Sequence, residues 1–284
     1  MRDVVFYHKN CLDGLFSAAT VYKYLKLKGR EEIVLIPLSH KDGIDLDLLD
    51  ESTNVWIVDF SFPYEVLKEI DSRVKFVTLY DHHISTESLI LLKDTLPNTH
   101  IYVDISRSGA RICWDKLFSS EAPRCILLSE DRDLWRFKFP ETRAFTESLM
   151  SRELNPDDEE TQKLLEKDNL DSYILEGETL FRSKTNRVKR AINKGFYGII
   201  KGNRTFFVNA SEDISEIGEA IYKSHTEPIV AAVYYIDGDV VKFSLRSNTV
   251  NVESIAREFN GGGHVGAAGF QLKLKWKELI NYIR

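Results

Sequence analysis

An apolar segment runs into a carboxylate and two imidazoles at Val74-Lys75-Phe76-Val77-Thr78-Leu79-Tyr80-Asp81-His82-His83. Its apolar and aromatic residues are typical of a buried strand. Two more apolar segments end in the same way, since residues 4–7 lead into His8 and residues 55–58 lead into Asp59. The carboxyl ends of parallel strands share one edge of a sheet, where open α/β folds bind ligands. The pattern therefore predicts one site at that edge.

The composition indicates a globular protein with an ample core, since the 284 residues are 43% hydrophobic and 29% charged. No apolar run approaches the roughly 18 residues of a membrane span, so we expect no membrane partner. Cys11, Cys113 and Cys125 form no Cys-x-x-Cys pair, which favours a reducing cytoplasm over a disulfide framework. A net charge of −6 argues against coating long nucleic acid, but it allows a short phosphorylated substrate.

The order of predicted elements divides the chain into three parts. Strands alternate with helices over residues 1–150, which predicts a mostly parallel sheet. Residues 151–190 are rich in charge and are expected to form a helical connector. Hairpin signals at Gly202-Asn203 and Asp237-Gly238 predict an α+β domain over residues 191–284, with a last helix at 276–283. The expected fold is α/β with a smaller α+β C-terminal domain and an active site in the cleft between the two.

Five side chains at predicted strand ends or strand–helix junctions are candidate metal ligands. Carboxylates and imidazoles without thiolates suit manganese or magnesium better than zinc or iron. Three of them have an alternative role: Asp13 as a cap of the following helix, Asp59 as a cap or turn residue, and Asp131 as a salt-bridge partner that chemistry does not separate from Asp133. The candidates are His8, Asp13, Asp59, His82 and Asp131.

These segments, in this order, resemble the DHH phosphoesterase superfamily with a DHH-associated C-terminal domain, in particular its nano-RNase or oligoribonuclease-like members. The likeness covers nearly the whole chain. It rests on residues 8–14, the strand ending in Asp59, Asp81-His82-His83, residues 131–135, residues 244–247 and residues 261–269.

The resemblance implies two divalent metal ions, with manganese the expected metal. It implies His8 on one ion, Asp59 bridging, and Asp13, His82 and Asp131 on the other ion. Asp81 and His83 are the implied catalytic pair, with His83 facing the scissile phosphate. Many relatives carry a second aspartate in the first motif, where this chain has Cys11, with Asn10 beside it. Either residue could replace that carboxylate.

The second domain supplies candidate phosphate-binding groups. Three consecutive glycines, Gly261, Gly262 and Gly263, let backbone amides approach an anion, and the alternative is a flexible turn. Arg246 and His264 would add charge-assisted donors. Ser108, in the first domain, is a candidate for lining the cleft, and its alternative is a helix N-cap.

The predicted function is metal-dependent hydrolysis of short single-stranded RNA or DNA oligonucleotides, or of dinucleotides, to nucleoside monophosphates. Two alternatives remain open at this point. One is a phosphatase for monoesters such as 3′-phosphoadenosine 5′-phosphate, and the other is a non-catalytic nucleotide sensor. The sequence indicates no oligomeric state.

Overall fold

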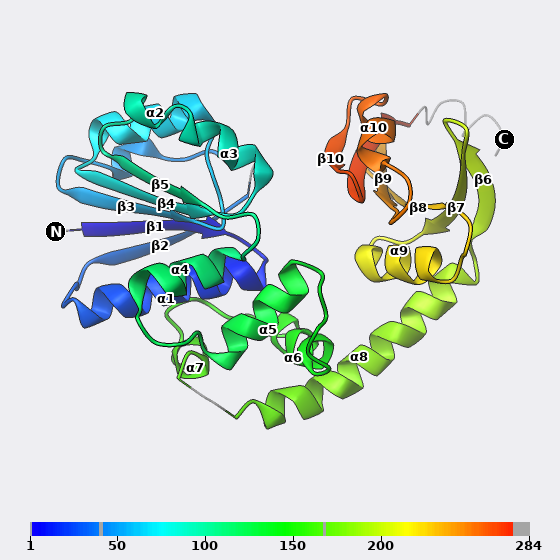
Figure 1. The fold of residues 1–284 in the computed structure, drawn as a ribbon, viewed down its shortest axis with the longest axis horizontal. Coiled ribbons are helices and arrows are strands. Elements are labelled where there is room, and N and C mark those ends of the chain that lie inside the picture. The colour runs from blue at the N-terminus through cyan, green and yellow to red at the C-terminus, as the bar shows by residue number, and fades with distance from the viewer. Residues whose placement is uncertain (1, 40–41, 167–168, 275–284) are drawn as a thin grey trace. The chain divides into compact units, whose positions relative to one another are not determined.

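The computed structural model describes the chain except for residues 1, 40–41, 167–168 and 275–284. It separates into two compact units, Met1–Phe181 and Arg182–Arg284, and each is treated by itself (Figure 1). The boundary between the two units falls inside one helix, α8 (Asp171–Ile192). The helix predicted at 276–283 lies outside the described residues.

The first unit is built on a five-stranded sheet in which every neighbouring pair is parallel, as predicted. Val4, Val5 and Phe6 are fully buried, so this strand is covered on both faces, as parallel sheets require. The strand order is β2-β1-β3-β4-β5, so β2 lies on one side of β1, and β3, β4 and β5 lie on the other. The carboxyl ends of β1 and β3 therefore flank a topological switch point of the sheet. The strands are β1 (Arg2–His8), β2 (Ile33–Leu38), β3 (Thr53–Val58), β4 (Phe76–Asp81) and β5 (Thr99–Val103).

Helices cover both faces of this sheet (Figure 1). On one face α1 (Leu12–Leu27) and α4 (Gly109–Leu117) contribute Val21 and Ile112 to a core with Val5 and Val58. On the other face lie α2 (Tyr64–Arg73) and α3 (Ile84–Ile90), which bury Leu67 and Leu89. Two 3₁₀ turns, η1 (Leu46–Leu48) and η2 (Lys93–Thr95), complete the connections.

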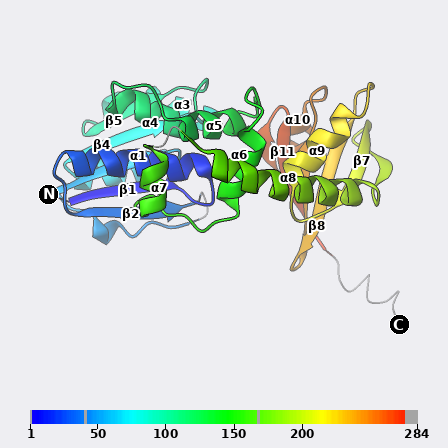
Figure 2. The same cartoon turned by 90° about the horizontal axis from the view of Figure 1, so that it is seen from below.

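A helical layer follows the sheet in the first unit. It consists of α5 (Arg124–Asp133), α6 (Thr142–Met150), α7 (Glu159–Leu164) and the first part of α8. Leu164, Leu170 and Tyr173 are buried here with Phe16 of α1. Gln162 on α7 donates to the Ala19 carbonyl on α1 at 3.2 Å, and the two helices lie together in Figure 2. The charged stretch predicted as a connector therefore contributes to the core of the first unit.

The second unit is an α+β domain with a six-stranded mixed sheet, as predicted. Only β7–β8 is a parallel pair, and the other pairs are antiparallel. Gly202 and Gly238 adopt φ values of 78° and 60° at the two predicted hairpin turns, a conformation that favours glycine. The elements are β6 (Phe196–Ile200), β7 (Asn203–Asn209), α9 (Ile214–Lys223), β8 (Val230–Asp237), β9 (Val240–Arg246), α10 (Val252–Arg257), β10 (Gly262–His264) and β11 (Ala267–Lys273).

A membrane-spanning helix was not expected from the sequence. Among the helices within the described ranges, none is both long enough and apolar enough to cross a bilayer.

Candidate metal centre

Three strand ends deliver polar side chains to the switch point of the first sheet. His8 is the last residue of β1, Asp59 follows β3, and Asp81 ends β4 with His82 and His83 directly after it. The Asp59 amide donates to the Tyr80 carbonyl at 3.0 Å, so the ladder continues one residue beyond β3. Because β1 and β3 flank the reversal of strand order, the side chains at their ends meet where open α/β folds bind ligands.

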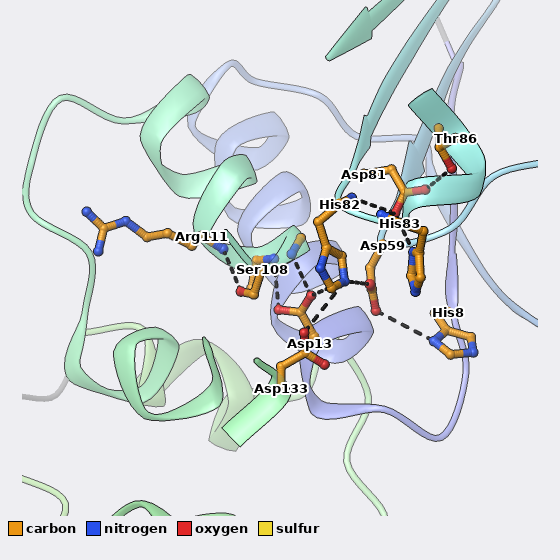
Figure 3. Close-up of polar contacts among 12 residues, drawn as sticks. His8, Asp13, Asp59, Asp81, His82, His83, Thr86, Ser108, Arg111 and Asp133 are labelled. Carbon is orange, nitrogen blue, oxygen red and sulfur yellow. Dashed lines mark hydrogen bonds and ion pairs between the residues drawn. The ribbon is translucent and has the colours of Figure 1, made fainter. Parts of the chain in front are cut away.

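Three carboxylates converge on the His82 imidazole (Figure 3). Its Nε2 lies 3.1 Å from Asp59 Oδ1, 3.6 Å from Asp133 Oδ2 and 3.7 Å from Asp13 Oδ2. Asp13 stands in the first turn of α1, and Asp133 is the last residue of α5. Strand ends and helix ends therefore build this cluster together.

Two glycines permit the close approach of these elements. A Cβ on Gly14 would lie 2.0 Å from the His8 carbonyl oxygen, so only glycine lets α1 start against the end of β1. A Cβ on Gly109 would lie 2.7 Å from Asp59 Cβ and 3.0 Å from Asp13 Oδ2. The Gly109 amide instead donates to Asp13 Oδ2 at 2.5 Å.

Asp13 also caps a helix, although not the helix that the sequence suggested. Its Oδ1 accepts from the Ala110 amide at 3.0 Å, beside the Gly109 contact, so it binds two free amides at the N-terminus of α4. The side chain is 1% exposed. This contact fixes α4 to α1 and holds Asp13 Oδ2 toward His82.

Asp131, a ligand candidate from the sequence, belongs to none of the groups of candidate ligand atoms among the described residues, whereas Asp133 belongs to one. Asp131 Oδ1 accepts from the Lys138 amide, and its Oδ2 accepts from the Phe139 amide and the Thr142 hydroxyl. These bonds fold the loop after α5 and use both oxygens. Asp133, two residues further along the helix, faces His82 instead.

Asp81 holds the second histidine of the motif. Its Oδ1 lies 2.7 Å from His83 Nδ1 and accepts from the His82 amide at 2.8 Å, while Oδ2 accepts from the Thr86 hydroxyl. Asp81 is fully buried. Burial alone would lower the pKa of His83, but the Asp81 contact outweighs it and raises this pKa. The pairing directs the other ring nitrogen of His83 away from Asp81.

The electrostatics of the cluster favour a cation. Burial alone would lower the pKa of His82, but the bond to Asp59 and the charges of Asp13 and Asp133 outweigh it and raise this pKa to about 10. Burial and the Asp59 charge raise the pKa of Asp133 to about 6, and the same two causes raise that of Asp13. For Asp59, burial would raise the pKa, but contacts with His8 and His82 hold it below its ordinary range. The carboxyl groups of Asp13, Asp59 and Asp133 thus surround the His82 imidazole, whose protonated form they favour.

Two buried oxygens fit metal ions. Asp59 Oδ2 and Asp133 Oδ2 are buried, and neither has a hydrogen-bond partner among the described residues. An unpaired buried carboxylate oxygen is costly unless a cation binds it. In each of three groups of described residues, the potential ligand atoms lie within 4.8 Å of one another. The groups are His8–Cys11–Asp59, Asp13–His82–Asp133, and Asp59–Asp81–His82–His83. Asp59 is the one residue that the first and the last group share.

Ser108 is placed inside the fold rather than on a surface. It is fully buried, and its hydroxyl caps α4 by accepting from the Arg111 amide at 3.3 Å. The sequence left open whether Ser108 lines the cleft or caps a helix, and in the structure its side chain caps α4.

In the second unit two glycines of the run, Gly262 and Gly263, lie in the short strand β10. Gly262–His264 pairs antiparallel with β11 and lies at the edge of the sheet, and His264 is exposed. Arg246 ends β9 and packs its stem over Gly218, while its guanidinium donates to Ser215 Oγ at 3.3 Å and to the Leu245 carbonyl at 3.0 Å. These residues all belong to the second unit, whereas the His82 cluster belongs to the first.

A hollow of about 740 Å³ opens beside the cluster within the first unit. Its wall includes Cys11, Asp13 and Asp133, and it therefore reaches the candidate ligands. Pockets of roughly 300–1,000 Å³ hold small molecules. Basic side chains also line it, those of Lys9, Arg132 and Arg152.

Comparison with known proteins agrees with this architecture. Residues 206–284 match the model of the DHHA1 domain. The chain is 30% identical over 285 residues to an uncharacterized protein of Acanthamoeba polyphaga mimivirus, covering 94% of this chain and spanning 66% of the length of that relative.

Solved structures show the same fold at low identity. The pGpG-specific phosphodiesterase PggH from Vibrio cholerae aligns with a TM-score of 0.55 at 15% identity, over 100% of this chain and 97% of that one. The exonuclease RecJ bound to manganese aligns with a TM-score of 0.53 at 14% identity, over 99% of this chain and 88% of that one. The chain therefore has the same fold as these two structures, and its residues 206–284 match a DHHA1 domain.

Two features of the site were not selected from the sequence. The sequence analysis names Asp131 as the candidate, because chemistry alone does not distinguish it from Asp133. Cys11 was noted as standing in place of a carboxylate, and the structure places it in one group with His8 and Asp59.

Proposed function

We propose that the protein is a divalent-metal-dependent phosphodiesterase that hydrolyses short oligonucleotides or dinucleotides to nucleoside monophosphates. The observation that carries this proposal is Asp59, whose two oxygens face different ligand groups. Oδ1 lies 3.1 Å from His82 Nε2, and Oδ2 lies 3.7 Å from His8 Nδ1. A carboxylate shared in this way suits two cations about 3.5–4 Å apart.

The residues that would hold the cations form two positions around Asp59. His8 and Asp59 belong to the first position, and Asp13, His82 and Asp133 to the second. Imidazole and carboxylate ligands favour manganese over magnesium at the second position. When bound, two such cations lower the pKa of a shared water toward neutrality and neutralise charge on a phosphate.

The protein's own residues would orient the phosphate. His83 is held by Asp81 through Nδ1, so its other ring nitrogen can donate to a non-bridging phosphate oxygen. Its raised pKa favours the protonated form, which would strengthen this bond as negative charge develops on the non-bridging oxygens. Asp81 acts as the positioning residue for His83.

The substrate class follows from size and charge. The hollow beside Asp13 and Asp133 has the volume of a small-molecule pocket, and basic side chains on its wall suit a nucleotide phosphate. A net charge of −6 disfavours long polyanions. The names of the structural relatives, a pGpG-specific phosphodiesterase and an exonuclease, support the same chemistry. We further propose that Arg246, His264 and the glycine run contribute phosphate contacts from the second unit, called the DHHA1 unit below because it contains the DHHA1 match.

The test uses purified protein with manganese and a panel of labelled di- to decanucleotides, cyclic dinucleotides and monoesters. We expect hydrolysis of the shortest oligonucleotides to monophosphates, and its loss in Asp59→Asn. Tight binding of a nucleotide by the metal-loaded, folded protein without any turnover would contradict the proposal and would favour a nucleotide sensor. Turnover confined to monoesters would replace it with a phosphatase.

A further inference from the structure

A thiol stands in one of the two candidate cation positions. His8, Cys11 and Asp59 each offer a ligand atom, and these atoms lie within 4.8 Å of one another. Cys11 directly precedes α1, and its side chain makes no capping hydrogen bond for that helix. The helix therefore gives no structural reason for a cysteine at this point, where serine, threonine, aspartate or asparagine is preferred.

A second observation at the same place points to a ligand. Asp59 is 1% exposed, and its Oδ2 accepts no hydrogen bond from any described residue. The nearby His8 Nδ1 is 3.7 Å away, beyond hydrogen-bond length. This oxygen is directed toward the His8 side of Asp59, while Oδ1 is used by His82 (Figure 3). A cation bound by His8, Cys11 and Asp59 would satisfy it.

The alternatives for the missing carboxylate are not equivalent. Asn10 has a φ of 58° and an exposed side chain, and it belongs to no group of candidate ligands in the described part of the chain. The other two cysteines are fully buried in hydrophobic clusters, Cys113 with Val21 and Cys125 with Leu128. Cys11 is the cysteine that is partly exposed.

We propose that Cys11 binds a cation as a thiolate together with His8 and Asp59, so that this position selects zinc or a similarly soft divalent ion. The second position, Asp13–His82–Asp133, offers oxygen and imidazole ligands without sulfur and takes a harder ion such as manganese. The centre would then hold two different metals. On binding, the Cys11 thiol releases its proton to solvent and the sulfur donates an electron pair to the cation. This proposal rests on the proposed function, because it refines the metals of the same site.

Cobalt(II) gives a readout that does not depend on activity. A thiolate bound to cobalt produces a sulfur-to-metal charge-transfer absorption in the near ultraviolet, whereas carboxylate and imidazole ligands do not. Titrating metal-free protein with cobalt should give two bound ions and this band. Cys11→Ser should abolish the band and weaken zinc binding by more than the roughly 10–100-fold typical of losing a partner that only supports a metal ligand.

Two further variants make the result decisive. Cys11→Asp replaces the thiolate by a carboxylate of similar reach, so it should still bind two cobalt ions, give no band, and accept manganese at both positions. Cys125→Ala is the matched control and should keep the band, because Cys125 is buried and its thiol donates to the Leu164 carbonyl.

The outcomes separate this proposal from the proposed function. Two bound cobalt ions without the band in the wild-type protein, or a band that persists in Cys11→Ser, would overturn the role of Cys11 and leave the two-cation site standing. A folded wild-type protein that binds no cobalt would overturn both.

Discussion

Asp59 is the residue on which both candidate cation positions depend. It is not a glycine, yet it adopts a φ of 51°, a left-handed conformation that costs of order 1–3 kcal/mol. The bond from its amide to the Tyr80 carbonyl and the contact of Oδ1 with His82 hold it there. Strain of this kind at the end of a buried strand is typical of a functional residue.

Asp131 and Asp133 offer a matched test of which carboxylate belongs to the centre. Asp133→Asn removes a charge beside His82, so we expect loss of one bound metal and a fall in turnover of at least about 100-fold. Asp131→Asn should keep both metals and lower the free energy of unfolding by about 1–3 kcal/mol, because its two oxygens accept three hydrogen bonds.

Metal content by mass spectrometry and chemical denaturation measure these two effects. If Asp131→Asn loses metal while Asp133→Asn keeps it, the assignment made from the sequence was the better one.

The sequence could not separate these two residues for a geometric reason. Positions two apart on a helix face different directions, so either Asp131 or Asp133 can face the site, but not both. The rotation of α5 about its axis is set by the burial of its apolar residues Cys125, Ile126 and Leu128. That packing is a tertiary property, whereas the chemistry of the two carboxylates is the same.

The N-terminus of α4 is the element that closes the site. Asp13 accepts from the Gly109 and Ala110 amides, and Gly109 leaves room for Asp59. Helix α4 thereby fixes two candidate ligands at once.

Gly109→Ala should therefore disturb the centre although no ligand is removed. The added Cβ would meet Asp59 Cβ at 2.7 Å, so we expect metal affinity to fall by roughly 10–100-fold. Gly43→Ala is the control, because a Cβ there meets nothing within 4 Å and its φ is not in the left-handed region. Calorimetric titration with manganese compares the two. Equal affinities in both variants would show that α4 does not position the ligands.

At the level of strands and helices, the sequence predicted most of the first unit. Buried parallel strands read as continuous apolar runs, so β1, β3 and β4 and their polar ends were visible. The strand β10 was not, because glycines have no side chain with which to show a strand pattern, and its pairing with β11 is a tertiary contact. Helix α7 falls in the stretch predicted to be helical, but its charged sequence did not reveal that Leu164 is buried.

The pH dependence of stability belongs to the molecule as a whole. In the metal-free protein the pKa of Asp133 is raised to about 6, so its ionisation in the folded state removes stability as the pH rises through this value. The pKa of His82 is raised to about 10, so its ion pair contributes stability that is complete below about 6.5 and is lost progressively as the pH rises from there through about 10. Metal binds the deprotonated carboxylates.

We therefore expect the rise in melting temperature caused by manganese to grow from pH 5 to pH 8. Each proton that the metal displaces changes its affinity by up to tenfold per pH unit, or about 1.4 kcal/mol. Thermal unfolding with and without manganese at four pH values measures this. A shift that is constant, or greatest at pH 5, would argue against Asp133 as a ligand.

The two units are proposed to divide the work. Arg246→Ala should raise the Michaelis constant for di- and trinucleotides by about one to two decades, the usual cost of one charge-assisted hydrogen bond, and leave the metal content unchanged. The artificial substrate p-nitrophenyl phosphate should be affected less, since it has no second nucleotide to hold. Equal losses on both substrates, or loss of metal, would speak against a substrate-binding role for the DHHA1 unit.

The two-cation centre around Asp59 is tested most directly by anomalous diffraction from crystals grown with manganese and zinc. We predict two anomalous peaks about 3.5–4 Å apart, both within bonding distance of Asp59. One should lie beside His8 and Cys11, and the other beside Asp13, His82 and Asp133. A single peak away from Asp59, or one bound by Asp131, would contradict the account.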